Sequence, residues 1–194
     1  MRRYRPLAVL LASFLIAACG GGRDDEEATT TTKATTGSTL PAPAGDVAPL
    51  TGLPQPDAAR RGRVALVVKI DNAPKGRPQE GLNQADVVIV EKVEDGVTRL
   101  FTVFQTNDAD PVGPVRSARS TDVALVSTLN RPLFAYAGTN AAFQALVDAA
   151  PLMDVGFNKA SSAYRRVSGR PAPYNLFSST GALFAKAPAD ATGP

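Results

Sequence analysis

The chain has 194 residues, a formal net charge of +3, a single cysteine, and neither histidine nor tryptophan. Without histidine it cannot use Ser-His-Asp or Cys-His catalysis, and one cysteine excludes an internal disulfide and a zinc site made of cysteines. Beyond Arg5 the remaining 18 basic residues balance 18 acidic ones, which excludes a nucleic-acid binder held by phosphate charge.

The first 18 residues have the order of a lipoprotein signal peptide. Basic residues 1–5 precede an apolar run over 7–18, which is about a dozen residues long, whereas a membrane-spanning helix needs about 20. Residues 16–19 (IAAC) resemble a bacterial lipobox, and the resemblance implies cleavage before Cys19 and a diacylglyceryl thioether on its sulfur, with acyl chains such as palmitate. We therefore expect an extracytoplasmic protein anchored to the outer face of the cytoplasmic membrane by a lipid on Cys19. The alternative is a buried N-terminal helix with an incidental cysteine.

Residues 19–49 are predicted to form a disordered tether after the lipidated cysteine. The Thr-rich tract 29–39 has no large apolar residue, so it cannot bury enough surface to offset the entropy of ordering. Thirty flexible residues reach roughly 30 Å, which lifts a domain away from the lipid headgroups. We place one folded domain at 50–187, as the length favours, and a disordered tail at 188–194.

Three strands are predicted in the first half of this domain. Residues 63–70 (RVALVVKI) and 85–93 are apolar at both odd and even positions, as expected of strands covered on both faces. Residues 71–83 contain two prolines and two glycines and are expected to be a loop. Asp95-Gly96 suits a type I′ turn, so a third strand at 98–105 should pair antiparallel with the second.

Helices are predicted mainly in the second half. A helix at 122–129 would be capped by Ser120 or Thr121, and a helix at 140–150 would be capped by Thr139 or Asn140. A strand at 132–137 separates them, and residues 178–180 could cap a last short helix at 181–186. The apolar face of the second helix is expected to contain Phe143, Leu146 and Val147. This order predicts an α/β or α+β fold with a mixed sheet, an antiparallel hairpin at 85–105 and two to three helices.

Arg116 and Arg119 form the first candidate site. They stand three residues apart, with Ser117 between them, immediately before a predicted helix start. Guanidinium groups bind phosphate or carboxylate with two hydrogen bonds, and helix-terminal N–H groups add partial positive charge. The site therefore suits an anionic ligand. The alternative is that both arginines pair internally with carboxylates, for which the candidates are Asp71, Asp86, Glu91 and Asp122.

A second set of candidates follows the first predicted strand, where sites gather in α/β folds. Lys69, Asp71 and Asn72 stand at the strand end, and Arg77 and Gln79 lie in the loop after it. The Asp71 and Asn72 side chains could hold a hydroxyl-rich ligand or a cation, or they could form an Asx turn. The two loop residues could complete a pocket or only decorate the turn.

The predicted hairpin determines which charged residues lie opposite each other on its two strands. A two-residue Asp-Gly turn places Lys92 opposite Arg99, an unfavourable pair of like charges that Glu94 could neutralise from the diagonal position. Glu91 would project from the other face, either ion-paired with an arginine or functional.

The segment from Pro49 to about Phe184 resembles the YerB-like family of bacterial lipoproteins. The matching stretches are 49–53 (PLTGL), 69–72 (KIDN), 77–82 (RPQEGL), 85–88 (ADVV), 96–99 (GVTR), 113–119 (GPVRSAR) and 172–176 (APYNL). The family usually has histidine where this chain has Tyr174, and a glycine pair where it has Gly138-Thr139. The resemblance implies an envelope lipoprotein of Gram-positive type without an established activity. It also implies a C-terminal domain after the segment present here.

We favour a non-catalytic envelope protein that binds an anionic or sugar-rich component. The alternatives are an envelope hydrolase or transferase, with Asp71 and Glu91 as an acid–base pair, and an inactive truncated family member. The expected partners are the cell membrane, through the lipid anchor, and a cell-wall polymer or envelope protein. We expect no cofactor, metal or nucleic acid. The candidate ligand-binding residues are Lys69, Asp71, Asn72, Arg77, Gln79, Glu91, Arg99, Arg116, Ser117 and Arg119.

Overall fold

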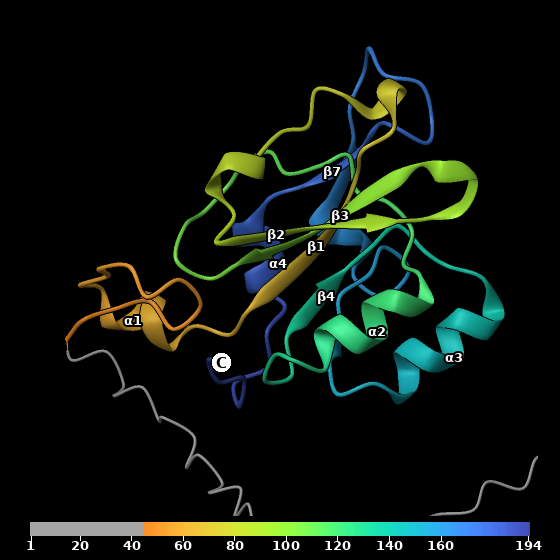
Figure 1. Ribbon diagram of the computed structural model, residues 1–194. Coiled ribbons are helices and arrows are strands. Elements are labelled where there is room, and N and C mark those ends of the chain that lie inside the picture. The colour runs from red at the N-terminus through yellow and green to blue at the C-terminus, as the bar shows by residue number, and fades with distance from the viewer. Residues whose placement is uncertain (1–44) are drawn as a thin grey trace, which may run out of the picture. The chain divides into compact units, whose positions relative to one another are not determined.

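The computed structural model of the chain describes residues 45–194 (Figure 1). The predicted signal peptide, the lipidation site Cys19 and the tether up to residue 44 lie outside the described residues. Within residues 45–194, no helix is both long enough and apolar enough to cross a membrane.

The centre of the domain is a five-stranded mixed sheet with the strand order β2-β3-β1-β4-β5. Strand β3 pairs antiparallel with both β1 and β2, whereas β4 runs parallel to β1 and to β5. The strands are β1 (Leu66–Asp71), β2 (Val87–Lys92), β3 (Thr98–Phe104), β4 (Leu133–Ala135) and β5 (Met153–Asp154). The predicted mixed sheet with an antiparallel hairpin is confirmed, and the fold is α+β.

Helices and a small second sheet surround this sheet. The helices are α1 (Ala58–Gly62), α2 (Ser120–Val126), α3 (Ala141–Ala149) and α4 (Thr180–Phe184). Short 3-10 helices are η1 (Pro74–Gly76), η2 (Leu82–Gln84), η3 (Glu94–Gly96) and η4 (Ser161–Ala163). Strands β6 (Tyr164–Arg166) and β7 (Leu176–Ser178) form an antiparallel pair. The sequence analysis missed β5, β6 and β7, because strands of two or three residues are too short for a periodic pattern.

Both faces of the sheet are covered, each by a different layer. Helices α2 and α3, which lie side by side in Figure 1, pack on one face and contribute Val126 and Val147 to its apolar cluster. The opposite face packs against β7 and α4, which contribute Leu176 and Leu183. Every residue of β1 is buried, as predicted for a strand covered on both sides.

Strand β2 is less covered than the sequence predicted. It lies at the edge of the sheet, and Val88 and Val90 are 41% and 61% exposed. These two valines lie outside the apolar cluster that β7 and α4 form over β1 and β3. The prediction of cover on both faces is therefore wrong for this strand, because the pattern of apolar residues does not tell an edge strand from a central one.

The turn of the hairpin has the predicted backbone, but its register is shifted by one residue. Asp95 and Gly96 have φ values of 58° and 72°, as a type I′ turn requires. However, the Val93 N–H donates to the Val97 carbonyl (2.8 Å), so an extra residue is present on the β2 side, as in a β-bulge. Glu91 consequently lies opposite Arg99. The predicted opposition of Lys92 and Arg99 is wrong, since Lys92 lies opposite Thr98.

The helix starts were predicted within two residues. Helix α2 begins at Ser120, so Arg119 occupies the N-cap position predicted for Ser120 or Thr121, and that prediction is wrong; Asp122, in the first turn, accepts the Arg119 N–H through Oδ2 (2.6 Å). Asn140 caps α3 as one of the two predicted alternatives, since its Oδ1 accepts the Phe143 N–H (2.9 Å).

The buried face of α3 differs from the predicted one. Val147 is buried, but Leu146 is 45% exposed, so Leu146 does not belong to the core face.

Ordered contacts extend past both predicted ends of the domain. The Ala48 N–H donates to the Leu53 carbonyl (2.8 Å), and Ala48 is buried. At the other end, Asn130 Nδ2 donates to Thr192 Oγ1 (3.1 Å) and to the Gly193 carbonyl (3.0 Å). Residues 45–49 and 188–194, predicted to be tether and tail, therefore have defined contacts with the domain.

Candidate anion-binding site

Three arginine side chains line one hollow of about 280 Å³, which we call the arginine hollow. Arg99 comes from β3, and Arg116 and Arg119 come from the segment before α2. The complete lining is Asp71, Ala73, Val93, Glu94, Asp95, Val97, Arg99, Arg116, Arg119 and Tyr174. Arg116 and Arg119, predicted as one site, therefore line the same hollow as Arg99, which comes from the hairpin.

Backbone hydrogen bonds hold residues 114–118 against the end of the sheet. The Asp71 N–H donates to the Pro114 carbonyl (2.9 Å), and the Arg116 N–H donates to the Lys69 carbonyl (2.8 Å). On the other side, the Ala137 N–H donates to the Arg116 carbonyl (2.9 Å). This segment therefore lies between the end of β1 and the residues that follow β4, which fixes the arginines at this end of the sheet.

Arg99 is the most buried of the three arginines, with 7% of its surface exposed. Its Nη1 donates to the Ser117 carbonyl (2.9 Å), and no carboxylate within residues 45–194 forms an ion pair with it at 4.0 Å or less. Burial lowers the pKa of Arg99, and the charges of Arg119 and Arg116 lower it further, whereas the charges of Glu94 and Asp71 raise it. A buried cation next to two like charges is unfavourable unless an anion is near.

Arg116 and Arg119 each have a carboxylate partner and also unused donors. Arg116 Nε donates to Asp71 Oδ2, and the Tyr174 ring lies 5.6 Å from the guanidinium carbon. Arg119 donates from Nε to Glu94 and from Nη1 to the Ala118 carbonyl (2.8 Å). Within the described part of the chain, neither terminal nitrogen of Arg116 makes a hydrogen bond, nor does Nη2 of Arg119. The internal pairing weighed from the sequence is thus present, and it leaves N–H groups open.

A cluster of buried charges lies beside the arginine hollow. Lys69 is fully buried, and its Nζ donates to Asp122 Oδ1 (2.6 Å) and forms an ion pair with Glu91 Oε2. Burial lowers the pKa of Lys69, whereas the charge of Asp122 raises it. Glu91 Oε1 has no hydrogen-bond partner among the described residues. Two carboxylates thus share one lysine, and the cationic Arg99 stands opposite Glu91 in the sheet.

The predicted acid–base pair of Asp71 and Glu91 does not form. Asp71 contacts Arg116 and its Oδ1 accepts the Ala73 N–H (2.6 Å), which is the Asx turn considered as an alternative. Glu91 is 7% exposed and faces Lys69 rather than an arginine, so the expected pairing with an arginine is wrong. The two carboxylates therefore do not meet in one open pocket.

Of the remaining predicted site residues, two support the loop beside the arginine hollow, one lines a neighbouring hollow, and one is exposed. Asn72 Nδ2 donates to Thr98 Oγ1 (2.8 Å), and Gln79 Nε2 donates to Asn72 Oδ1 (2.8 Å). These amides tie the loop after β1 to the hairpin, next to the arginine hollow. Ser117 lines a neighbouring hollow. Arg77 is exposed and outside the lining of the arginine hollow.

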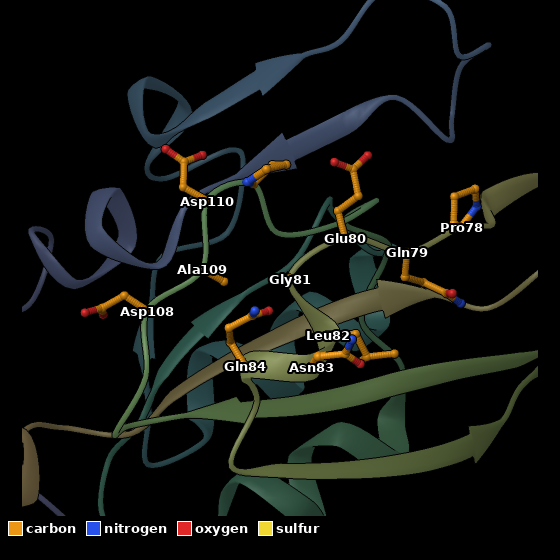
Figure 2. A pocket seen from close by; sticks show the side chains of 11 residues that line it. Pro78, Gln79, Glu80, Gly81, Leu82, Asn83, Gln84, Asp108, Ala109 and Asp110 are labelled. Atoms are coloured by element: carbon orange, nitrogen blue, oxygen red, sulfur yellow. The ribbon is translucent and has the colours of Figure 1, made fainter.

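The largest hollow lies elsewhere and has a different chemistry. It measures about 630 Å³ and is formed by residues 78–84 and 108–111 (Figure 2). Figure 2 shows the carboxylates of Glu80 and Asp110 on the same side of it, and Asp108 adds a third acidic group. No lysine or arginine lines this hollow, so it suits an anion poorly despite its size. The sequence analysis missed it, because loop packing leaves no periodic signal.

Metal binding has no support in the described residues. No group of three or more Cys, Asp or Glu side chains between residues 45 and 194 could hold a metal ion.

The comparisons with known proteins agree with the resemblance seen in the motifs. Residues 50–192 match the family described as "Protein of unknown function (DUF3048) N-terminal domain". The chain belongs to this family. A member from Bacillus subtilis (strain 168), named "Putative lipoprotein YerB", is 46% identical over 78 residues, which are 40% of this chain and 23% of that protein.

The fold of the DUF3048 domain is also found in a solved relative. The crystal structure of the YerB protein from Bacillus subtilis matches with a TM-score of 0.65 and 30% sequence identity. The match covers 71% of this chain and 47% of that structure. The chain thus spans less than half the length of the relatives it matches, and the predicted YerB-like membership is confirmed.

Proposed function

We propose that the protein is a lipoprotein anchored by Cys19 to the outer face of the cytoplasmic membrane, and that its DUF3048 domain binds an anionic envelope component in the arginine hollow. The succession of basic residues, an apolar run and the lipobox-like residues 16–19, together with the name of the Bacillus relative, supports the anchor. The observation that carries the binding proposal is Arg99, which is buried between two other arginines without a carboxylate partner of its own.

The chemistry of the arginine hollow suits phosphate or carboxylate. Charge-assisted hydrogen bonds to guanidinium are among the strongest in proteins, and they strengthen where water is partly excluded. Asp71 holds the Nε atom of Arg116, so it orients this side chain while leaving both terminal nitrogens for a ligand. Arg119 keeps Nη2 open beside its ion pair with Glu94. Asp71, Glu94 and Asp95 together offset the formal charge of the three arginines in the lining.

The proposed tether fits this placement. A lipid chain contributes about 0.8 kcal/mol per buried CH₂ group, so two or more acyl chains hold a protein on the membrane. The proposed tether between Cys19 and residue 45 has about 25 residues, and a flexible chain of this length reaches roughly 25–30 Å, which would carry the arginine hollow from the headgroups into the wall.

A retention experiment tests the binding proposal. The full chain in detergent is incubated with purified peptidoglycan and with anionic wall polymer, and the bound fraction is measured after washing. We expect Arg116→Ala combined with Arg119→Ala to lose retention. The matched control is Arg165→Ala with Arg166→Ala, two adjacent arginines on β6 outside the arginine hollow. Unchanged retention of the first variant, with an unchanged circular dichroism spectrum, would refute the proposal.

The anchor is tested separately by changing Cys19 to Ala. We expect this variant to lose the mass of the lipid and to leave the membrane fraction, whereas the arginine variants stay there. A variant that remains membrane-bound without Cys19 would show that another segment holds the protein.

A further inference from the structure

A second hollow adjoins the arginine hollow and shares two residues with it. It measures about 510 Å³ and is lined by Glu94, Ser117, Arg119, Ala137, Gly138, Thr139, Asn140 and Asn158. Glu94 and Arg119 line both hollows. The two spaces therefore meet at the ion pair between these side chains, and we call the second space the amide hollow.

Apart from the shared ion pair of Glu94 and Arg119, the residues that line the amide hollow are neutral. Asn140 Oδ1 caps α3 and Thr139 Oγ1 donates to the Ala118 carbonyl (3.3 Å). By contrast, the Ser117 hydroxyl, Asn140 Nδ2 and the Asn158 amide make no hydrogen bond within residues 45–194. Hydroxyls and amides both donate and accept hydrogen bonds, so these open groups match the hydroxyl groups of a ligand.

The ion pair between the two hollows is easily displaced. The Glu94 side chain is 58% exposed and contacts Arg119 through a single carboxylate oxygen. Exposed ion pairs contribute little net stability. A phosphate can instead offer oxygens to Arg99, Arg116 and Arg119 together, so it competes successfully with Glu94 for the guanidinium of Arg119. Displacing Glu94 joins the two hollows into one.

We propose that the joined hollows bind a polyol phosphate. Its phosphate contacts the three arginines, its hydroxyl groups contact Ser117 and Asn158 in the amide hollow, and the Glu94 carboxylate competes for the phosphate position until the ligand binds. This inference rests on the proposed function, because it names the class of anion that the arginine hollow takes.

Two probes separate the phosphate and hydroxyl contacts. The full chain in detergent is titrated with inorganic phosphate and with glycerol phosphate in a calorimeter. We expect glycerol phosphate to bind about tenfold more tightly, since one or two well-formed hydrogen bonds give this difference. Asn158→Ala should bring glycerol phosphate down to the affinity of inorganic phosphate and leave inorganic phosphate unchanged. Equal binding of the two probes to the unmodified chain would overturn the polyol inference while leaving the anion proposal standing.

The same titrations show whether the proposed function itself fails. If the unmodified chain binds neither probe, the arginine hollow is not an anion site and both proposals fall. If Asn158→Ala weakens both probes equally, the amide hollow acts only by supporting the arginines, and the hydroxyl contact is refuted.

The competition by Glu94 has its own matched control. Glu94→Gln should tighten inorganic phosphate binding severalfold, because it removes the competing carboxylate from Arg119. Asp95→Asn also removes one negative charge from the lining of the arginine hollow, but Asp95 forms no ion pair with an arginine of residues 45–194, and asparagine tolerates the left-handed backbone at this position. An equal gain in both variants would show only a general effect of charge and would refute the competition.

A polyol phosphate can come from a lipid headgroup or from a soluble polymer, and the membrane composition distinguishes these sources. The lipidated chain is placed in vesicles of phosphatidylcholine, with or without phosphatidylglycerol, and titrated with glycerol phosphate. A headgroup that occupies the joined hollows lowers the apparent affinity for the free probe in the second vesicles. A soluble source leaves the two affinities equal, because the tether keeps the hollows away from the lipid.

Discussion

The two faces of the central sheet are made by the same strands, yet their chemistry differs. On the face covered by β7 and α4, alternate residues of β1 are all apolar, namely Leu66, Val68 and Ile70. On the face covered by α2 and α3, the strand begins with Val67 but continues with Lys69 and Asp71. Strand β1 is therefore apolar along the whole of the first face, whereas charged side chains replace part of the apolar area on the second face.

This difference supports the proposed location of the binding site. Burying paired charges costs desolvation free energy that the pairing often fails to recover, and apolar residues of similar size are usually as stable. Lys69, Glu91 and Asp122 are buried together at the end of the sheet where the arginine hollow opens. We therefore interpret the buried cluster as the support that sets the charge next to Arg99, and the apolar face as the part that stabilises the domain.

The largest expected effect comes from removing the shared cation. Lys69→Met leaves the buried carboxylates of Glu91 and Asp122 without their shared cation, so the free energy of unfolding should fall by about 3–5 kcal/mol. Urea unfolding followed by circular dichroism measures this change. Lys92→Met, an exposed lysine on β2, is the control and should stay within about 0.5 kcal/mol of the unmodified chain. A stable Lys69→Met protein would mean that the cluster is not ionic in solution.

Adjacent residues of β3 then separate the two faces. Leu100 is 4% exposed and belongs to the apolar cluster under β7 and α4. Leu100→Ala should lower the free energy of unfolding by about 2–4 kcal/mol while the folded protein binds phosphate as before. Titration under conditions where the variant remains folded provides the measurement. Loss of binding in the folded variant would show that the apolar face also shapes the arginine hollow.

Arg99→Gln changes the neighbouring residue of β3 and should affect phosphate binding more than stability. It removes the buried cation from the arginine hollow, so phosphate affinity should fall by about ten- to a hundredfold, as expected for one lost charged hydrogen bond with desolvation. The free energy of unfolding should change less than in Leu100→Ala, because replacing Arg99 leaves no carboxylate without its ion-pair partner. A variant that binds phosphate normally would remove the observation on which the proposed function rests.

The sequence predicted the apolar face better than the charged one, and for a physical reason. Strand β1 and the hairpin follow from runs of apolar residues and from the Asp95-Gly96 turn, both of which are local signals. The position of Glu91 opposite Arg99 depends on the bulge beside this turn. No local pattern in the sequence predicts this bulge. Similarly, nothing around Lys69 predicts that Asp122, 53 residues later, comes to contact it.

The candidate arginines were visible in the sequence, but their surroundings were not. Arg116 and Arg119 were recognised from their spacing and from the helix that follows. The hollow between them depends on how residues 114–118 pair with both β1 and the end of β4, and these contacts join segments far apart in the chain. The amide hollow and Asn158 were missed for the same reason.

The smallest expected effect concerns the exposed ion pair of Glu94, and it depends on pH. The hydrogen bond from Arg119 lowers the pKa of Glu94 below its usual 4.5. A lowered pKa in the folded state means that the unfolded chain binds the proton first, so the stabilisation from Glu94 is complete above pH 4.5 and is lost as the pH falls through the folded value. Glu94→Gln should therefore differ slightly from the unmodified chain in its urea midpoint at pH 7, and the difference should vanish well below pH 4.5. High salt should also shrink it at pH 7, because exposed charges are screened. A difference that persists in acid and in salt would mean that Glu94 contributes through packing, and then its displacement by a ligand would cost more than the polyol inference allows.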